Sequence, residues 1–125
     1  MPDSLGDRMK SFYEDRSRVY LTRRTPVIVR VDGRAFHTLT KTADKPFDSH
    51  LIGVMTRAAI KTANDMQGFK LGYVQSDEAS FLLLDTDTLT TEAWFDLNLQ
   101  KIVSISASLM TAYFNRFAGE LPEEG

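Results

Sequence analysis

The stretch Arg30-Val-Asp-Gly-Arg-Ala-Phe-His37 decides how this chain of 125 residues folds. The residues leading into it (25–31, Thr-Pro-Val-Ile-Val-Arg-Val) form a β-branched run entered through a proline, which predicts a buried β-strand. The strand ends on Asp32, and Gly33 then lets the backbone turn tightly or approach a ligand. Such a strand end can hold a cation and a phosphate chain together. Taken alone, however, an Asp-Gly pair after a strand more often marks only a hairpin turn.

A second acidic stretch favours the functional interpretation. In Gly72-Tyr-Val-Gln-Ser-Asp-Glu-Ala-Ser-Phe-Leu-Leu-Leu84, two carboxylates interrupt an otherwise apolar run. The pattern predicts strands at 71–75 and 79–84, joined by a short corner at Ser76, Asp77 and Glu78.

The spacing of apolar residues predicts three helices, at 4–22, 50–67 and 97–118. Ser4 can cap the first helix, and Asp48 or Ser49 can cap the second. Gly68 is expected to end the second helix as its C′ residue. Trp94 and Phe95 are expected to cover the edge of the core.

This order of elements, an N-terminal helix followed by β–α–β–β–α, predicts an α+β fold. It is a ferredoxin-like unit without its last strand. In that topology the first strand lies beside the third, so Asp32 and the Asp77-Glu78 corner should meet at one edge of the sheet. The length suits one domain over 1–125, with a helical extension over 1–24.

Composition narrows the function classes. With 42% apolar and 26% charged residues the chain is ordinary globular material, and it shows neither a leader nor a membrane-spanning run. The absence of Cys excludes disulfides and thiolate metal sites and fits a cytoplasmic protein. The net charge of −2 argues against bulk nucleic-acid binding. Residues 1–70 nevertheless carry 13 Lys and Arg against 8 acids, whereas residues 71–125 carry 2 against 9.

The two acidic stretches together suit two-metal chemistry. Carboxylates from neighbouring strands can bridge two Mg²⁺ ions roughly 3.5–4 Å apart. Asp32 and Asp77 would be the bridging pair, and the Gly33 carbonyl could add a ligand. Glu78 would be a third ligand or a modulator of the local pKa, or it may only cap the corner. The Asp85-Thr-Asp87 loop could also bind a metal, although solvated turn residues are the more usual interpretation.

The segment after Asp32 suits a triphosphate. The backbone N–H groups from Gly33 to His37 could cradle it, Arg34 and Lys45 could supply cations, and Phe36 or His37 could pack on a sugar or base. His37 alone is more often a hydrogen-bonded histidine than a base, and Ser76 more often a turn residue. Asp32 and Asp77 fit a structural role less well, because two acids beside apolar strands repel unless something neutralises them.

Four motifs together resemble the tRNA(His) guanylyltransferase family. They are Arg30-Val-Asp-Gly-Arg-Ala-Phe-His37, Lys45-Pro-Phe-Asp48, Gly72-Tyr-Val-Gln-Ser-Asp-Glu78 and Ala107-Ser-Leu-Met-Thr-Ala-Tyr-Phe114. The opening Ser4-Leu-Gly-Asp-Arg-Met-Lys10 and the Trp94-Phe95 pair look more like its bacterial and phage branch.

The resemblance implies a polymerase-like palm that adds a nucleotide to the 5′ end of tRNA in the 3′–5′ direction, with GTP and ATP as substrates. It implies that Asp32, Gly33 and Asp77 hold two Mg²⁺. The nucleotide would be held by Asp32, Gly33, Arg34, Ala35, Phe36, His37, Lys45, Asp48, Ser76 and Asp77. Family members run on past this chain through a fourth palm strand, so the first strand is expected to be a sheet edge. We expect a homo-oligomer, a dimer or a tetramer.

Two other functions stay open. Another palm-type two-metal enzyme, such as a nucleotide cyclase, would need the same carboxylates but no tRNA. A non-catalytic nucleotide-binding module would bind GTP and Mg²⁺ without transfer.

Overall fold

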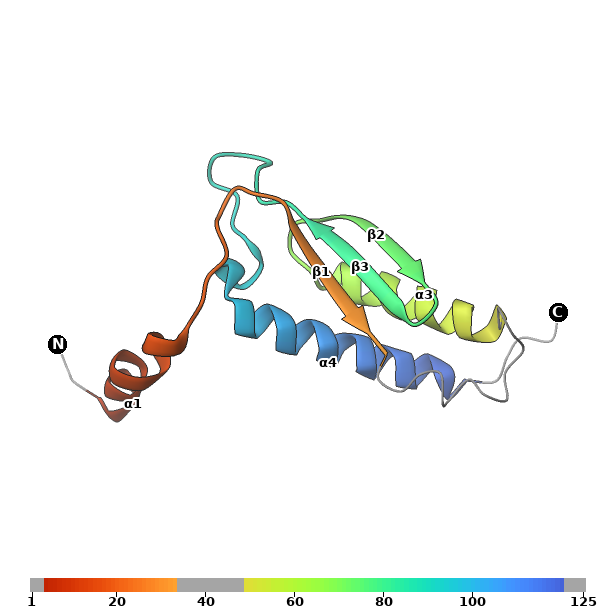
Figure 1. The fold of residues 1–125 in the computed structure, drawn as a ribbon, viewed down its shortest axis with the longest axis horizontal. Helices are drawn as coiled ribbons and strands as arrows, with labels where there is room; N and C mark the ends of the chain where they lie inside the picture. Colours follow the sequence, from red (N-terminus) through yellow and green to blue (C-terminus); the bar gives the residue numbers. More distant parts are fainter. Residues whose placement is uncertain (1–3, 34–48, 121–125) are drawn as a thin grey trace.

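A computed structural model describes residues 4–33 and 49–120. Three strands form one antiparallel sheet, and two long helices pack on one of its faces (Figure 1). The elements are β1 (Val27–Asp32), α3 (Ser49–Asn64), β2 (Phe69–Gln75), β3 (Glu78–Leu83), the short 3₁₀ turn η3 (Trp94–Leu97) and α4 (Leu99–Ala118).

The sheet has the order β1-β3-β2, with both pairs antiparallel. This confirms the predicted α+β fold and places the first strand beside the third. Asp32 lies opposite Glu78 and Val27 opposite Leu83. Within the described part of the chain β1 pairs only with β3, so its outer edge is free, as expected for this topology.

The prediction of a buried first strand holds for only one of its faces. Val27 and Val29 are buried under the helices, whereas Ile28 between them is 71% exposed. Successive side chains of a strand point to opposite faces, and no helix covers the second face of this sheet among the described residues. The strand also starts at Val27 and includes Asp32, so the carboxylate is its last residue.

The core lies between the sheet and the two helices. Ala58 of α3 is fully buried, and Phe81 at the centre of β3 is 1% exposed. The ring of Phe69 meets the edge of the Phe81 ring at a centroid distance of 6.2 Å. Small residues on α3 let it lie close to the sheet. Trp94 is buried at the core edge as expected, but Phe95 is 38% exposed.

The first helix is shorter than predicted. It consists of α1 (Leu5–Met9), a π-helical turn η1 (Lys10–Glu14) and a 3₁₀ turn η2 (Asp15–Ser17), which lie apart from the sheet (Figure 1). The chain is then extended, because it pairs with the residues before α4. The N–H of Leu21 donates to the carbonyl of Leu97 at 2.9 Å, and the N–H of Leu99 donates to the carbonyl of Val19 at 2.8 Å.

The other two helix boundaries also shift. The second helix, α3, ends at Asn64, and Gly68 lies four residues later in the turn into β2 with φ of +84°. The third helix begins at Leu99, where the Asn98 side chain accepts a hydrogen bond from the N–H of Lys101. Among the helices that the structure describes, none has the length and apolar character needed to cross a membrane.

Candidate active site

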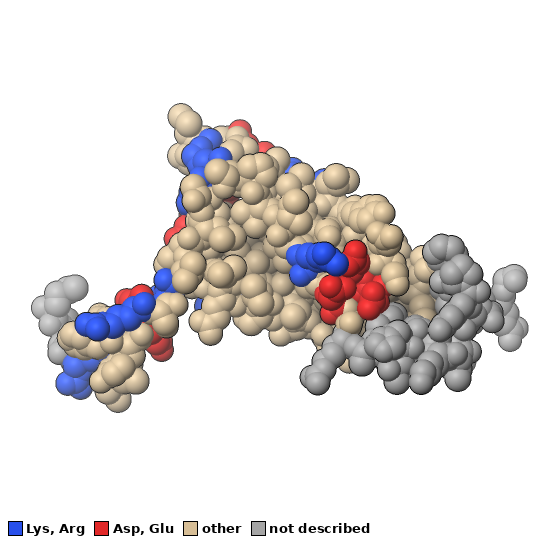
Figure 2. All heavy atoms as spheres, in the orientation of Figure 1, with Lys and Arg blue, Asp and Glu red and all other residues tan. Residues whose placement is uncertain are grey.

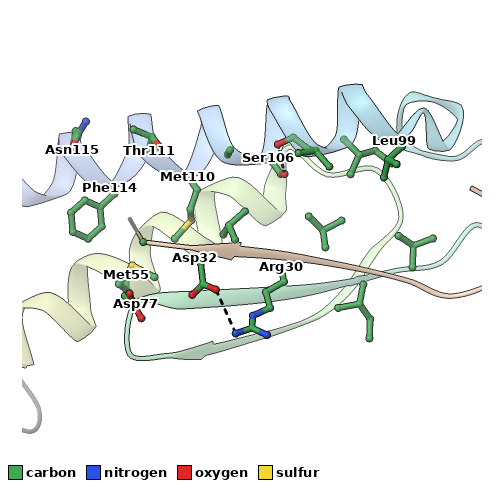
Figure 3. A pocket seen from close by; sticks show the side chains of 18 of the residues that line it. Arg30, Asp32, Met55, Asp77, Leu99, Ser106, Met110, Thr111, Phe114 and Asn115 are labelled. Carbon is green, nitrogen blue, oxygen red and sulfur yellow. Dashed lines mark hydrogen bonds and ion pairs between the residues drawn. The ribbon is translucent and has the colours of Figure 1, made fainter. Parts of the chain in front are cut away.

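A groove with a volume of about 570 Å³ lies between the free edge of β1 and α4. Its walls are mostly apolar and include Ile28, Val103 and Met110. Its polar lining residues include Asp32 and Asp77 where β1 ends, and Asn115 on α4 (Figure 3). An apolar groove with a few convergent polar groups is the usual form of a ligand site.

Asp32 and Asp77 are brought together by the backbone. The N–H of Gly33 donates to the carbonyl of Asp77 at 2.8 Å, which ties the end of β1 to the turn between β2 and β3. Both residues are part of the groove lining, and the Asp32 side chain projects from β1 on the side away from α4 (Figure 3). The predicted meeting of the two stretches at one sheet edge is therefore confirmed.

The turn that carries Asp77 has an unusual backbone. Ser76 adopts φ of +55°, a left-handed conformation that is uncommon for residues other than glycine. This tight turn between Gln75 and Glu78 places Asp77 directly before the start of β3, beside the end of β1. The position of Ser76 fits its interpretation as a turn residue.

Glu78 lies on the open face of the sheet, which is the face that no helix covers among the described residues. There it forms an ion pair and a hydrogen bond with Arg30. The same guanidinium lies 3.5 Å from a carboxylate oxygen of Asp32 (Figure 3). Arg30 therefore bridges two acids at the site, a role that the sequence reasoning missed. The signal was available, because an antiparallel register that pairs Asp32 with Glu78 puts Arg30 on the same face.

The remaining predicted nucleotide-binding residues lie outside the described residues. They are Arg34, Ala35, Phe36, His37, Lys45 and Asp48. The helix expected to follow them does begin at Ser49.

Both acids of the Asp85-Thr-Asp87 loop form ion pairs with basic side chains. The Asp85 side chain is 5% exposed and accepts hydrogen bonds from Arg23 Nε at 2.7 Å and from the N–H of Arg24. The hydrogen bond from Arg23 and then that from Arg24 hold the pKa of the Asp85 carboxyl below its usual value. Asp87 pairs with Lys70 at 2.9 Å. The interpretation of Asp85 as a solvated turn residue is therefore wrong.

The acids at the end of β1 suit a hard divalent cation. The Asp77 side chain has no hydrogen-bond partner among residues 4–33 and 49–120, and Asp32 has only its 3.5 Å contact with Arg30. Carboxylate and carbonyl oxygens are the ligands that Mg²⁺ prefers, and it uses few from protein. In the described part of the chain, no three His, Asp or Glu side chains cluster as metal ligands.

The strand order, the helices on one face and the paired acids at the end of β1 define an α+β domain of the polymerase-palm type. The chain belongs to the tRNAHis guanylyltransferase (Thg1) family, whose model matches residues 6–124.

Relatives and solved structures agree with this assignment. A probable tRNA(His) guanylyltransferase of Dictyostelium discoideum is 31% identical over 116 residues, 91% of this chain and 42% of the relative. The tRNA(His) guanylyltransferase of Debaryomyces hansenii is 33% identical over 127 residues, 99% of this chain and 45% of the relative.

Two solved structures are more similar in sequence. A bacterial tRNA(His) guanylyltransferase (Thg1)-like protein in complex with GTP is 51% identical with a TM-score of 0.86, covering 93% of this chain and 53% of that one. The corresponding complex with ATP is 50% identical with the same TM-score and covers 92% and 50%. The chain thus spans about half the length of the proteins that it matches.

Proposed function

We propose that this chain is the nucleotide-binding palm of a nucleotidyltransferase that adds a nucleotide to the 5′ end of tRNA in the 3′–5′ direction. The observation that carries the proposal is the meeting of Asp32 and Asp77 at the polar end of the groove. The nucleotide complexes of the bacterial relatives support GTP and ATP as substrates.

In the proposed reaction, the tRNA 5′ phosphate first attacks the α phosphorus of ATP, which gives a 5′ adenylate and releases pyrophosphate, or the tRNA already carries a 5′ triphosphate. The 3′-hydroxyl oxygen of the incoming nucleotide attacks the 5′ phosphorus, a new P–O bond forms, and AMP or pyrophosphate leaves. The hydroxyl proton passes to solvent.

Asp32, Asp77 and the Gly33 carbonyl would hold two Mg²⁺ ions, which when bound lower the pKa of the attacking hydroxyl and neutralise the leaving phosphate. The backbone bond between Gly33 and Asp77 keeps the donors from the two stretches in register. Arg30 holds Glu78 on the open face. We therefore propose that Glu78 acts by positioning Arg30 beside Asp32. We also propose that the remaining residues of the two stretches and of the segment after Asp32 contribute to nucleotide binding: Arg34, Ala35, Phe36, His37, Lys45, Asp48 and Ser76.

The test is transfer of labelled GTP to a 5′-triphosphorylated tRNA that lacks one nucleotide, with Mg²⁺ present. This chain should be compared with a polypeptide of the relatives' full length, since it spans about half of them. Label on the tRNA 5′ end supports the proposal. A cyclic product from GTP would identify a cyclase instead, and binding of GTP with no transfer by either polypeptide would leave only a nucleotide-binding module.

A tRNA-processing role favours a cytoplasmic location. Assembly into a homo-oligomer, either a dimer or a tetramer, stays a prediction. Fractionation of cells and sedimentation of the purified chain test these two points.

A further inference from the structure

We propose that the open face of the sheet binds the unpaired 5′-terminal bases of the RNA substrate, with Tyr73 as the stacking residue. This inference rests on the proposed function and deepens it, because it names the surface that holds the substrate beside Asp32 and Asp77.

The open face has a regular layout that follows from the register. Cross-strand partners project to the same side, so the face consists of three rows: Ile28, Leu82 and Leu71; Arg30, Ser80 and Tyr73; Asp32, Glu78 and Gln75. The charged atoms gather over the ends of β1 and β3, beside a broad uncharged surface (Figure 2).

The uncharged side chains on the two edge strands are strongly exposed. Leu71 and Tyr73 on β2 are 65% and 62% exposed, and Ile28 on β1, on the other side of β3, is 71% exposed. Exposed apolar side chains gathered on one sheet face mark an interaction surface rather than scattered surface residues. The hydroxyl of Tyr73 lies 3.5 Å from Oε1 of Gln75, which is on the same strand and in the next row of the open face.

The chemistry of the rows favours RNA over another occupant. The acids occupy only the row at the end of β1, where a cation-bound phosphate would lie. The next row offers the Arg30 guanidinium and an aromatic ring, which are the groups on which unpaired bases stack. Adjacent rows are about 7 Å apart along a strand and neighbouring strands are about 4.8 Å apart, so roughly 12 Å separate Asp32 on β1 from Tyr73 on β2, a distance that two successive nucleotides can span.

The matched control lies elsewhere in the chain. Tyr13 of η1 is 66% exposed, almost the same as Tyr73, but lies off the sheet. Its replacement removes the same chemical group without touching the open face. The variants to compare are Tyr73→Ala, Tyr73→Phe and Tyr13→Ala, with circular dichroism to show that each is folded.

The probe is a single-stranded RNA of six nucleotides with a 5′ phosphate and 2-aminopurine as its first base, with Mg²⁺ present and no nucleoside triphosphate. We expect wild type, Tyr73→Phe and Tyr13→Ala to quench the base equally, and Tyr73→Ala to raise Kd about tenfold. Unchanged Kd for Tyr73→Ala would overturn the inference. So would a change of sedimentation coefficient for Tyr73→Ala with RNA affinity intact, since the face would then bind another copy of the chain.

The two proposals can fail separately, because this assay measures binding and needs no catalysis. If wild type transfers no nucleotide but Tyr73→Ala weakens RNA binding, the proposed reaction fails and the RNA face stands. If transfer occurs and Tyr73→Ala binds RNA like wild type, the inference alone fails.

Discussion

The N–H of Gly33 donates a 2.8 Å hydrogen bond to the carbonyl of Asp77, residues 44 positions apart in the sequence. This bond joins the end of an edge strand to a hairpin turn and brings the two acidic stretches of the chain together. Because it is made by backbone atoms, it persists when either acidic side chain is replaced. The two acidic side chains can therefore be replaced without disrupting the backbone contact that brings them together.

Replacing Asp77 by Ala or Asn, or Asp32 by Asn, should reduce Mg²⁺-dependent nucleotide transfer by about a hundredfold or more, since each change removes a proposed metal ligand. The free energy of unfolding should change by no more than about 0.5 kcal/mol, because neither side chain is part of the core. Labelled GTP transfer and urea denaturation measure the two effects, and Asp87→Asn serves as an acidic control away from the groove. Transfer by Asp77→Ala at the wild-type rate would exclude the assigned ligand role.

Replacing Gly68 by Ala should destabilise the fold by roughly 1–3 kcal/mol. Gly68 has φ of +84°, and an added Cβ would lie 2.5 Å from the carbonyl oxygen of Leu84. The N–H of Leu84 also donates to the Gly68 carbonyl at 2.9 Å, so the turn cannot move freely. Thermal unfolding measures the loss. Gly53→Ala is the control, because a Cβ there meets nothing within 4 Å and the helix should be slightly stabilised.

Replacing Asp85 by Asn should destabilise the protein at neutral pH and much less in acid. The hydrogen bonds from Arg23 and Arg24 lower the pKa of Asp85 below 3.8, so the folded state favours the charged carboxylate. That stabilisation is present above the unfolded pKa and is lost as pH falls through the folded pKa. Urea denaturation of both proteins at neutral pH and well below pH 3.8 should give a wide gap and then a narrow one. A gap of equal size at both would mean that charge plays no part.

Replacing Phe81 by Ala should cost about 3–5 kcal/mol, because the ring is buried at the centre of the sheet and a cavity would remain. Phe81→Leu, which keeps most of the volume, should cost less. Chemical denaturation orders the two variants. Equal costs would show that the core collapses around the smaller side chain.

Most of the strands and helices could be predicted from the sequence, because the residue patterns that indicate them lie within each segment. The β-branched run before Asp32 and the interrupted run around Asp77 indicate strands by themselves, and the order of elements then fixes which strands are neighbours. The contacts that decide the details are not local. Residues 18–22 leave the helix to pair with residues 97–99, and that pairing has no signature in either segment.

The charged contacts were the hardest part of the site to predict. Asp85 looks like a turn residue until the fold brings Arg23 to it across 62 positions. By its sequence position Arg30 is an ordinary strand residue, and only the register of β1 with β3 shows that it contacts both Asp32 and Glu78. Phe95, Asp96 and Leu97 all adopt positive φ, a conformation that Asp visits more readily than most residues but that Phe and Leu do not favour. Arg23, which contacts Asp96 at 3.0 Å, helps to hold that turn.

Among the described residues β1 pairs only with β3, and this has a consequence for how its amide protons exchange with solvent. In an antiparallel strand, alternate residues turn their N–H groups toward the neighbouring strand and away from it. In β1 one set of amides bonds to β3 and the other set faces outward. Deuterium uptake along Val27–Asp32 should therefore alternate with every residue, with slow uptake toward β3 and rapid uptake at the edge.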